Sequence, residues 1–184
     1  MNLLETNGVA IMYKICKTEK SIQRQKLFQV TLLAMMEKQR YHDITVTALC
    51  KEMEIPRKTF YRYFEALEDV LFATIDDAIT RSFLHLEIKA DLESFFTYWE
   101  KNKYLLDVLE TNGLSPLLIN RIYEKYNRGI LLERVSEGGI TNKELKYAGY
   151  IAAIMTMLVS WHHSGMLQSP QDMTLLVREM FRID

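Results

Sequence analysis

Apolar residues recur at helical spacings along most of this chain. Intervals of three and four residues, which put side chains on one face of a helix, predict long helices over residues 20–39 and 66–86. The same spacing predicts further helices over residues 92–101, 103–110, 116–136, 142–164 and 171–182. Glycine and proline interrupt the pattern near residues 113, 138–139 and 165–170. The sequence therefore predicts an all-α chain without repeats or a flexible linker.

Residues 44–64 predict two shorter helices joined by a tight turn. Thr45 is suited to cap the first helix, whose buried face would carry Val46, Leu49, Cys50 and Met53. Pro56 cannot continue that helix but suits the opening turn of a second one. Phe60 and Phe64 lie four residues apart, so both can pack inward. The more exposed arc of the second helix then carries Arg57, Lys58, Thr59, Tyr61, Arg62 and Tyr63.

Two interpretations of this segment are open. It could be an ordinary helical hairpin whose cations are solvated. A structural helix rarely exposes two tyrosines among cations, however, and a three-residue interruption between helices this short fits a DNA-reading helix-turn-helix better than a bundle hairpin. The pattern therefore favours nucleic-acid binding.

The run Thr59-Phe60-Tyr61-Arg62-Tyr63-Phe64 resembles the Thr-(Leu/Phe)-Tyr-x-(His/Tyr)-Phe signature of the TetR family of transcriptional regulators. The resemblance extends over residues 21–75. It implies a three-helix DNA-binding head at residues 15–66, joined by a lever helix to an effector-binding and dimerisation body at residues 67–184. It also implies insertion of residues 56–64, beginning with Pro56, into the major groove of a near-palindromic operator. Phosphate contacts would come from Thr45, Thr47, Thr59 and Tyr61, and base contacts from Arg57 and Lys58, with Arg62 and Tyr63 beside them.

The segment departs from the family pattern at three positions. Glu54 stands where glycine is usual, so the turn needs a backbone angle that a glutamate tolerates or a slightly different turn. Pro56 replaces a small capping residue. Leu67 replaces a phosphate-contacting lysine, which removes one electrostatic contact of the kind that makes DNA binding salt-dependent. Lys51 and the N-terminal basic run are candidates to replace it.

Charge is distributed unevenly along the 184 residues. The net charge is −1, but residues 1–75 carry a balance of +2 and residues 76–184 one of −3. Within residues 14–26, five cations accompany the single acid Glu19. The cationic charge thus lies just ahead of and inside the predicted helix-turn-helix, as expected for a nucleic-acid interface. With 48% hydrophobic and 26% charged residues, the chain is predicted to be globular.

The two predicted C-terminal helices indicate self-association. Residues 150–159 are almost continuously apolar, so most of that helix must be buried. Pairing two such helices from each of two chains would form a four-helix bundle about a twofold axis. The predicted interface residues are Ile151, Ile154, Leu158, Leu176 and Met180. Trp161 to Met166, followed by Ser169 to Met173, resembles the C-terminal ending of one TetR branch, while a monomeric core remains the alternative.

No enzyme, cofactor or metal site is expected. The chain has no phosphate loop, catalytic triad order or paired-cysteine metal spacing. His162 and His163 are adjacent, so on a helix they point about 100° apart. Cys16 and Cys50 predict no disulfide framework. Without a secretory signal or a membrane-spanning run, the protein is expected to have no membrane contact and to be cytoplasmic.

Aromatic residues in the body could line a small-molecule effector pocket, although such residues more often form core. The candidates for this pocket are Phe95, Trp99, Tyr123 and Tyr126. The sequence thus predicts a homodimeric, ligand-responsive repressor that binds double-stranded operator DNA. A TetR-like protein without small-molecule response, acting through a protein partner, is the alternative.

Overall fold

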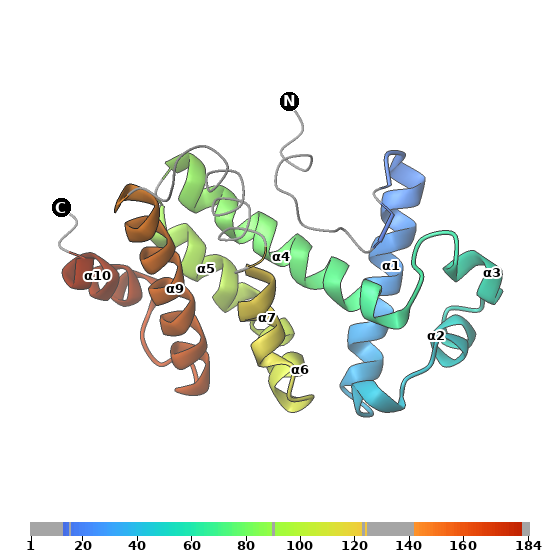
Figure 1. Ribbon diagram of the computed structural model, residues 1–184. Coiled ribbons are helices and arrows are strands. Elements are labelled where there is room, and N and C mark those ends of the chain that lie inside the picture. The colour runs from blue at the N-terminus through green and yellow to red at the C-terminus, as the bar shows by residue number, and fades with distance from the viewer. Residues whose placement is uncertain (1–12, 15, 90, 123, 125–141, 182–184) are drawn as a thin grey trace. The chain divides into compact units, whose positions relative to one another are not determined.

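The protein is all-helical over the residues that the computed structural model describes: 13, 14, 16–89, 91–122, 124 and 142–181 (Figure 1). The elements in chain order are α1 (Glu19–Met36), the 3-10 turn η1 (Tyr41–Asp43), α2 (Val46–Glu52), α3 (Arg57–Phe60), α4 (Leu67–Lys89), α5 (Leu92–Lys101), α6 (Lys103–Thr111), α7 (Ser115–Ile122), α9 (Asn142–His163) and α10 (Pro170–Phe181). The all-α prediction is confirmed for this part of the chain. No helix within it is long and apolar enough to cross a membrane.

The second short helix ends earlier than the sequence predicted. It was expected to reach Phe64, but α3 ends at Phe60. Arg62 and Tyr63 donate their N–H groups to the carbonyls three residues back, at 3.3 and 2.9 Å, which tightens the chain into a turn. The helix predicted over residues 116–136 is described only as α7, because residues 125–141 lie outside the described part.

The described chain forms two compact units. The first unit contains the described residues up to Ala78 and also Asp107–Ser115. The second unit contains Ile79–Leu106 and the described residues from Pro116 onward. Helices α4 and α6 each contribute residues to both units.

An aromatic cluster forms the centre of the first unit. The Phe28 ring of α1 meets the rings of Phe60 and Phe64 nearly edge-on, with centroids 5.5 and 5.6 Å apart. All three side chains are at most 1% exposed, and burying each contributes about 1.5–3 kcal/mol. The prediction that Phe60 and Phe64 pack inward is confirmed. Helix α1 packs on α2, and α2 packs on α3.

The Asn112 side chain links the segment Asp107–Ser115 of the first unit to the residues that follow α1. Its Oδ1 accepts the backbone N–H of Tyr41 at 2.7 Å, and its Nδ2 donates to the carbonyl of Met36 at 3.2 Å. The next residue, Gly113, has a φ of 69° and ends α6 in a Schellman motif. One amide side chain thus joins the end of α6 to the end of α1 and to η1.

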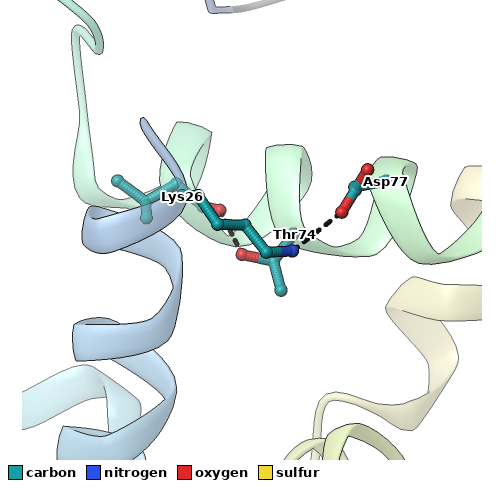
Figure 2. A network of polar contacts seen from close by, with 4 residues as sticks. Lys26, Thr74 and Asp77 are labelled. Atoms are coloured by element: carbon teal, nitrogen blue, oxygen red, sulfur yellow. Dashed lines mark hydrogen bonds and ion pairs between the residues drawn. The ribbon is translucent and has the colours of Figure 1, made fainter. Parts of the chain in front are cut away.

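Polar contacts also fix the start of α4. The buried Asp69 carboxylate accepts the N–H groups of Glu65 and Ala66 at 2.8 and 2.9 Å. One turn further, the Thr74 hydroxyl donates to the Val70 carbonyl, and Lys26 of α1 pairs with Asp77 at 2.8 Å (Figure 2). Because both charged groups are partly exposed, this ion pair contributes at most about 1 kcal/mol.

The core of the second unit is built around α5. Phe95, Phe96 and Trp99 are fully buried on one face of this helix. The ring of Phe83 meets Phe95, and the ring of Trp161 meets Phe96, both nearly edge-on at 5.8 and 5.7 Å. Helix α10 packs against α5.

The segment between α9 and α10 is held by its own residues. The Trp161 indole N–H donates to the Gln168 carbonyl at 3.0 Å, and Gly165, with a φ of 82°, ends α9 in a second Schellman motif. Ser169 and Asp172 then form a reciprocal cap at the start of α10. The Ser169 hydrogen bonds lower the pKa of Asp172.

Candidate nucleic-acid interface

Helix α2 supports the surface formed by the predicted DNA-binding residues. The Thr45 hydroxyl oxygen accepts the Ala48 N–H at 3.1 Å, so the predicted cap is confirmed. Leu49 and Cys50 are buried, whereas Val46 and Met53 are half-buried. Burial also raises the pKa of the Cys50 thiol. The face predicted to be buried is therefore only partly covered.

The turn after α2 has a left-handed residue at Glu54, whose φ is 51°. The N–H of Ile55 donates to the Cys50 carbonyl at 2.9 Å, and that of Glu54 donates to the Lys51 carbonyl at 3.1 Å. This pair of bonds defines a Schellman motif, in which glycine is usual at the left-handed position. The sequence analysis allowed either a different turn or the usual turn with a left-handed glutamate. The structure has the usual turn, with Glu54 in the left-handed conformation.

The predicted DNA-binding side chains lie at least partly at the surface of the first unit. Thr45, Thr47, Pro56, Arg57, Lys58, Tyr61 and Arg62 are exposed, and Thr59 and Tyr63 are half-buried. Pro56 precedes α3 as its N-cap residue, with extended backbone. The buried Phe60 anchors the segment from beneath, so cationic, phenolic and hydroxyl groups are presented outward from a packed base.

Arg57 and Tyr61 form a pair that the sequence analysis did not anticipate. The Arg57 Nη2 donates to the Tyr61 hydroxyl at 3.1 Å, and the Arg57 guanidinium lies 5.8 Å from the Tyr61 ring centroid. This hydrogen bond raises the pKa of Arg57. The four-residue spacing on a helical turn was the available signal. The pair leaves the remaining guanidinium donors and the tyrosine O–H to bind another group.

A second cation also lies beside an aromatic ring. The Arg62 guanidinium is 6.0 Å from the centroid of the Tyr63 ring. Leu67, at the start of α4, is half-buried and apolar, while Lys51 is exposed in the last turn of α2. The cationic groups of this surface therefore come from α2, α3 and the turn after α3.

The four residues predicted to line an effector pocket divide into two pairs. Phe95 and Trp99 are fully buried in α5, whereas Tyr123 and Tyr126 lie outside the described residues. The Trp99 indole N–H is buried without a hydrogen-bond acceptor in the described part of the chain. A buried unsatisfied donor costs about 1–3 kcal/mol, so this atom is a candidate contact for a bound molecule.

The five residues predicted for the dimer interface divide into a buried and an exposed group. Ile151, Ile154 and Leu158 are at most 2% exposed within the single chain, so their side chains contact its own core. Leu176 and Met180 of α10 are 45% and 53% exposed. The apolar character of α9 is therefore explained by burial within the single chain. The exposed positions at its centre are the small residues Ala152, Thr156 and Ser160.

The adjacent histidines of α9 differ in burial. His162 is buried and His163 exposed, yet their ligand atoms lie within 4.8 Å of each other. That upper limit exceeds twice the Zn–N bond length of about 2.0–2.1 Å, so the arrangement does not place both rings on one ion. Two imidazoles alone still fall short of the four ligands of a structural zinc site.

Comparisons of the chain with protein-family models, with curated proteins and with solved structures gave no match.

Proposed function

We propose that the protein is a sequence-specific regulator of transcription, a repressor that binds a near-palindromic operator as a homodimer. Helices α2 and α3 with the turn between them act as a TetR-like helix-turn-helix. The observation that carries this proposal is the Arg57–Tyr61 pair, which holds a guanidinium and a phenol at the surface above the buried Phe60. Such groups bind phosphates and base edges.

The short α3 divides the roles of its residues. In a helix-turn-helix the N-terminal residues of the second helix reach base edges, so Arg57 and Lys58 read sequence. Tyr61 and the threonines position the protein on the phosphate backbone. The Thr45 oxygen accepts the capping N–H, and its hydroxyl hydrogen is left to donate to a phosphate.

The test is a fluorescence-anisotropy titration with two duplexes of equal length, one from DNA upstream of the coding sequence and one scrambled. Tyr61→Ala weakens binding to both duplexes, whereas Arg57→Ala weakens binding mainly to the specific one, each by roughly 5- to 150-fold. Because the two side chains touch, the double variant loses less than the product of the single losses. Absence of salt-dependent binding to any duplex would contradict the proposal and favour action through a protein partner.

We further propose that an effector binds the second unit and acts through α4 as a lever. The unsatisfied Trp99 N–H supports a ligand that carries a hydrogen-bond acceptor. An effector with a coupling of about 1–3 kcal/mol lowers operator affinity roughly 5- to 150-fold. A ligand with equal affinity for both states of the protein would shift nothing.

Trp99→Phe tests the effector site, because it removes the N–H and keeps an aromatic ring. Native mass spectrometry of gently purified protein should show a small-molecule adduct on the wild type that the variant lacks. Operator binding by the ligand-free variant stays at the wild-type level. An adduct that persists in Trp99→Phe would exclude this contact.

The proposed dimer uses α10 and the small-residue face of α9. Leu176→Glu places a charge in that interface and yields folded monomers, measured by light scattering. Leu167→Glu, at an 82% exposed residue before α10, is the matched control and leaves the dimer intact. A monomeric wild type would contradict this part of the proposal.

A further inference from the structure

The described residues of the N-terminal segment, 13, 14 and 16–18, begin the first unit, and two of them contact residues far along the chain. The Tyr13 hydroxyl donates to Asp76 of α4 at 3.0 Å, and the Tyr13 ring lies 6.4 Å from that of Phe64. The Lys14 backbone N–H donates to the Tyr63 carbonyl at 3.4 Å. These contacts join residues up to 63 positions apart in the sequence. The segment is therefore attached directly to the turn after α3.

Both backbone groups of Lys14 are engaged. Its carbonyl accepts the Gln25 side-chain amide of α1 at 2.7 Å, opposite the bond to Tyr63. Thr18 then caps α1 by accepting the Ser21 N–H. Main-chain hydrogen bonds thus fix the position of Lys14, while its side chain remains exposed.

The cations of this region differ in whether they are neutralised. Lys26 is paired with Asp77. Lys14, Lys17 and Lys20 are exposed and have no ion pair or side-chain hydrogen bond with any described residue. The one acid among residues 13–24, Glu19, accepts from Gln23. The segment therefore presents uncompensated positive charge.

The chain that directly follows Arg62 supplies no lysine or arginine until Arg81. Around the start of α4 the chain instead carries the exposed acids Glu65 and Glu68. Phosphates beside the start of α4 would meet these acids unless another segment contributed positive charge. The bond from Lys14 to Tyr63 puts the segment next to Arg62, at the point where the cations end.

We propose that Lys14 and Lys17 form a second contact with the DNA phosphodiester backbone, continuous with the α3 surface. This inference rests on the proposed DNA-binding function. The contact is independent of base sequence, because the lysines carry charge but no fixed fork of donors. Tyr13 is a positioning residue that holds the segment on α4.

The salt dependence of DNA affinity reports how many phosphates the protein neutralises. Each neutralised phosphate changes the slope of log K against log salt concentration by about 0.9. The paired substitution Lys14→Gln/Lys17→Gln should make the slope shallower by about 1.8 between 50 and 200 mM KCl. The loss should be equal on specific and scrambled duplexes. Lys101→Gln/Lys146→Gln, at exposed lysines of the second unit, makes the same charge change and keeps the wild-type slope.

Tyr13→Phe tests the positioning role, because it removes the hydrogen bond to Asp76 and keeps the ring. A shallower salt slope at unchanged circular dichroism supports positioning, since a purely structural role would leave the slope alone. A wild-type slope in Lys14→Gln/Lys17→Gln, in a protein that binds DNA, would overturn this inference and leave the proposed function standing. Failure of the wild type to bind any duplex would overturn both.

Discussion

Glu54 and Met166 are the non-glycine residues with a positive φ in the described part of the chain, and Glu54 occupies the left-handed position that usually holds glycine after a helix. Helices α2, α6 and α9 end in the same pair of hydrogen bonds, and the left-handed position is Glu54, Gly113 and Gly165 in turn. Only α2 places a side chain there. We therefore predict that Glu54→Gly stabilises the protein.

The magnitude follows from two opposing terms. A left-handed conformation costs an L-residue about 1–2 kcal/mol, which glycine avoids. Glycine also makes the unfolded chain more flexible, which costs about 0.5–1 kcal/mol. The net gain for Glu54→Gly is then about 0.5–1 kcal/mol in the free energy of unfolding. For a chain of this length, that gain raises the melting temperature by a few degrees.

Urea denaturation followed by circular dichroism measures the effect, and the chain supplies its own controls. Glu54→Ala removes the charge but keeps the angle costly, so it should leave stability unchanged. Glu52→Gly, at the last residue of α2, should lower stability by about 0.5–1 kcal/mol. Gly113→Ala should also lower it by about 1 kcal/mol through the backbone angle alone, because a Cβ there meets no atom within 4 Å.

Two results would refute the reasoning. One is a Glu54→Gly variant no more stable than the wild type while Gly113→Ala is destabilised. The other is equal stabilisation by Glu54→Gly and Glu54→Ala, which would assign the effect to charge and not to the backbone.

Three further predictions follow from polar contacts. Asn112→Ala should lower the free energy of unfolding by about 2 kcal/mol in urea titrations, because Tyr41 and Met36 lose their partner. Burial, with the charges of Glu68 and Asp69, raises the pKa of Tyr41 to about 12. The unfolded phenol ionises near pH 10, so stability should fall between pH 10 and 12, and Tyr41→Phe should lack this fall. The pKa of Asp172 is lower in the folded protein than in the unfolded chain. Its ionised carboxylate therefore adds fully to the free energy of unfolding above the ordinary aspartate pKa, and this stabilisation is lost as the pH falls through the lowered pKa. Asp172→Asn should therefore flatten the acid end of the stability curve.

Local signals predicted the helices well where cap and apolar spacing agreed. The bounds of α5 are those predicted, because Asp91 caps its start by accepting the Ser94 N–H and its apolar residues share one face. The start of α2 was predicted in the same way, from Thr45, which accepts the Ala48 N–H. Caps and apolar spacing depend only on residues close in sequence. They therefore predict a helix whichever element packs against it.

Partner choice was what the sequence could not determine. The apolar run in α9 indicated burial on most sides, but the pattern was the same whether a second copy or the chain's own core covered it. Other contacts join residues far apart in sequence, so no local spacing predicts them. Examples are the hydrogen bonds of Asn112, Tyr13 and Lys14. The Arg57–Tyr61 pair was within reach, because its spacing is that of one helical turn.

The different environments of the two cysteines have a practical consequence for following the N-terminal segment. Cys50 is 2% exposed and burial raises its pKa, so little reactive thiolate reaches solvent. Cys16 is free, partly exposed and lies between Lys14 and Lys17. A maleimide dye would therefore label the natural sequence at Cys16 alone. The chain thus carries a single attachment point for a fluorescent reporter within the segment proposed to approach DNA, without any engineered cysteine.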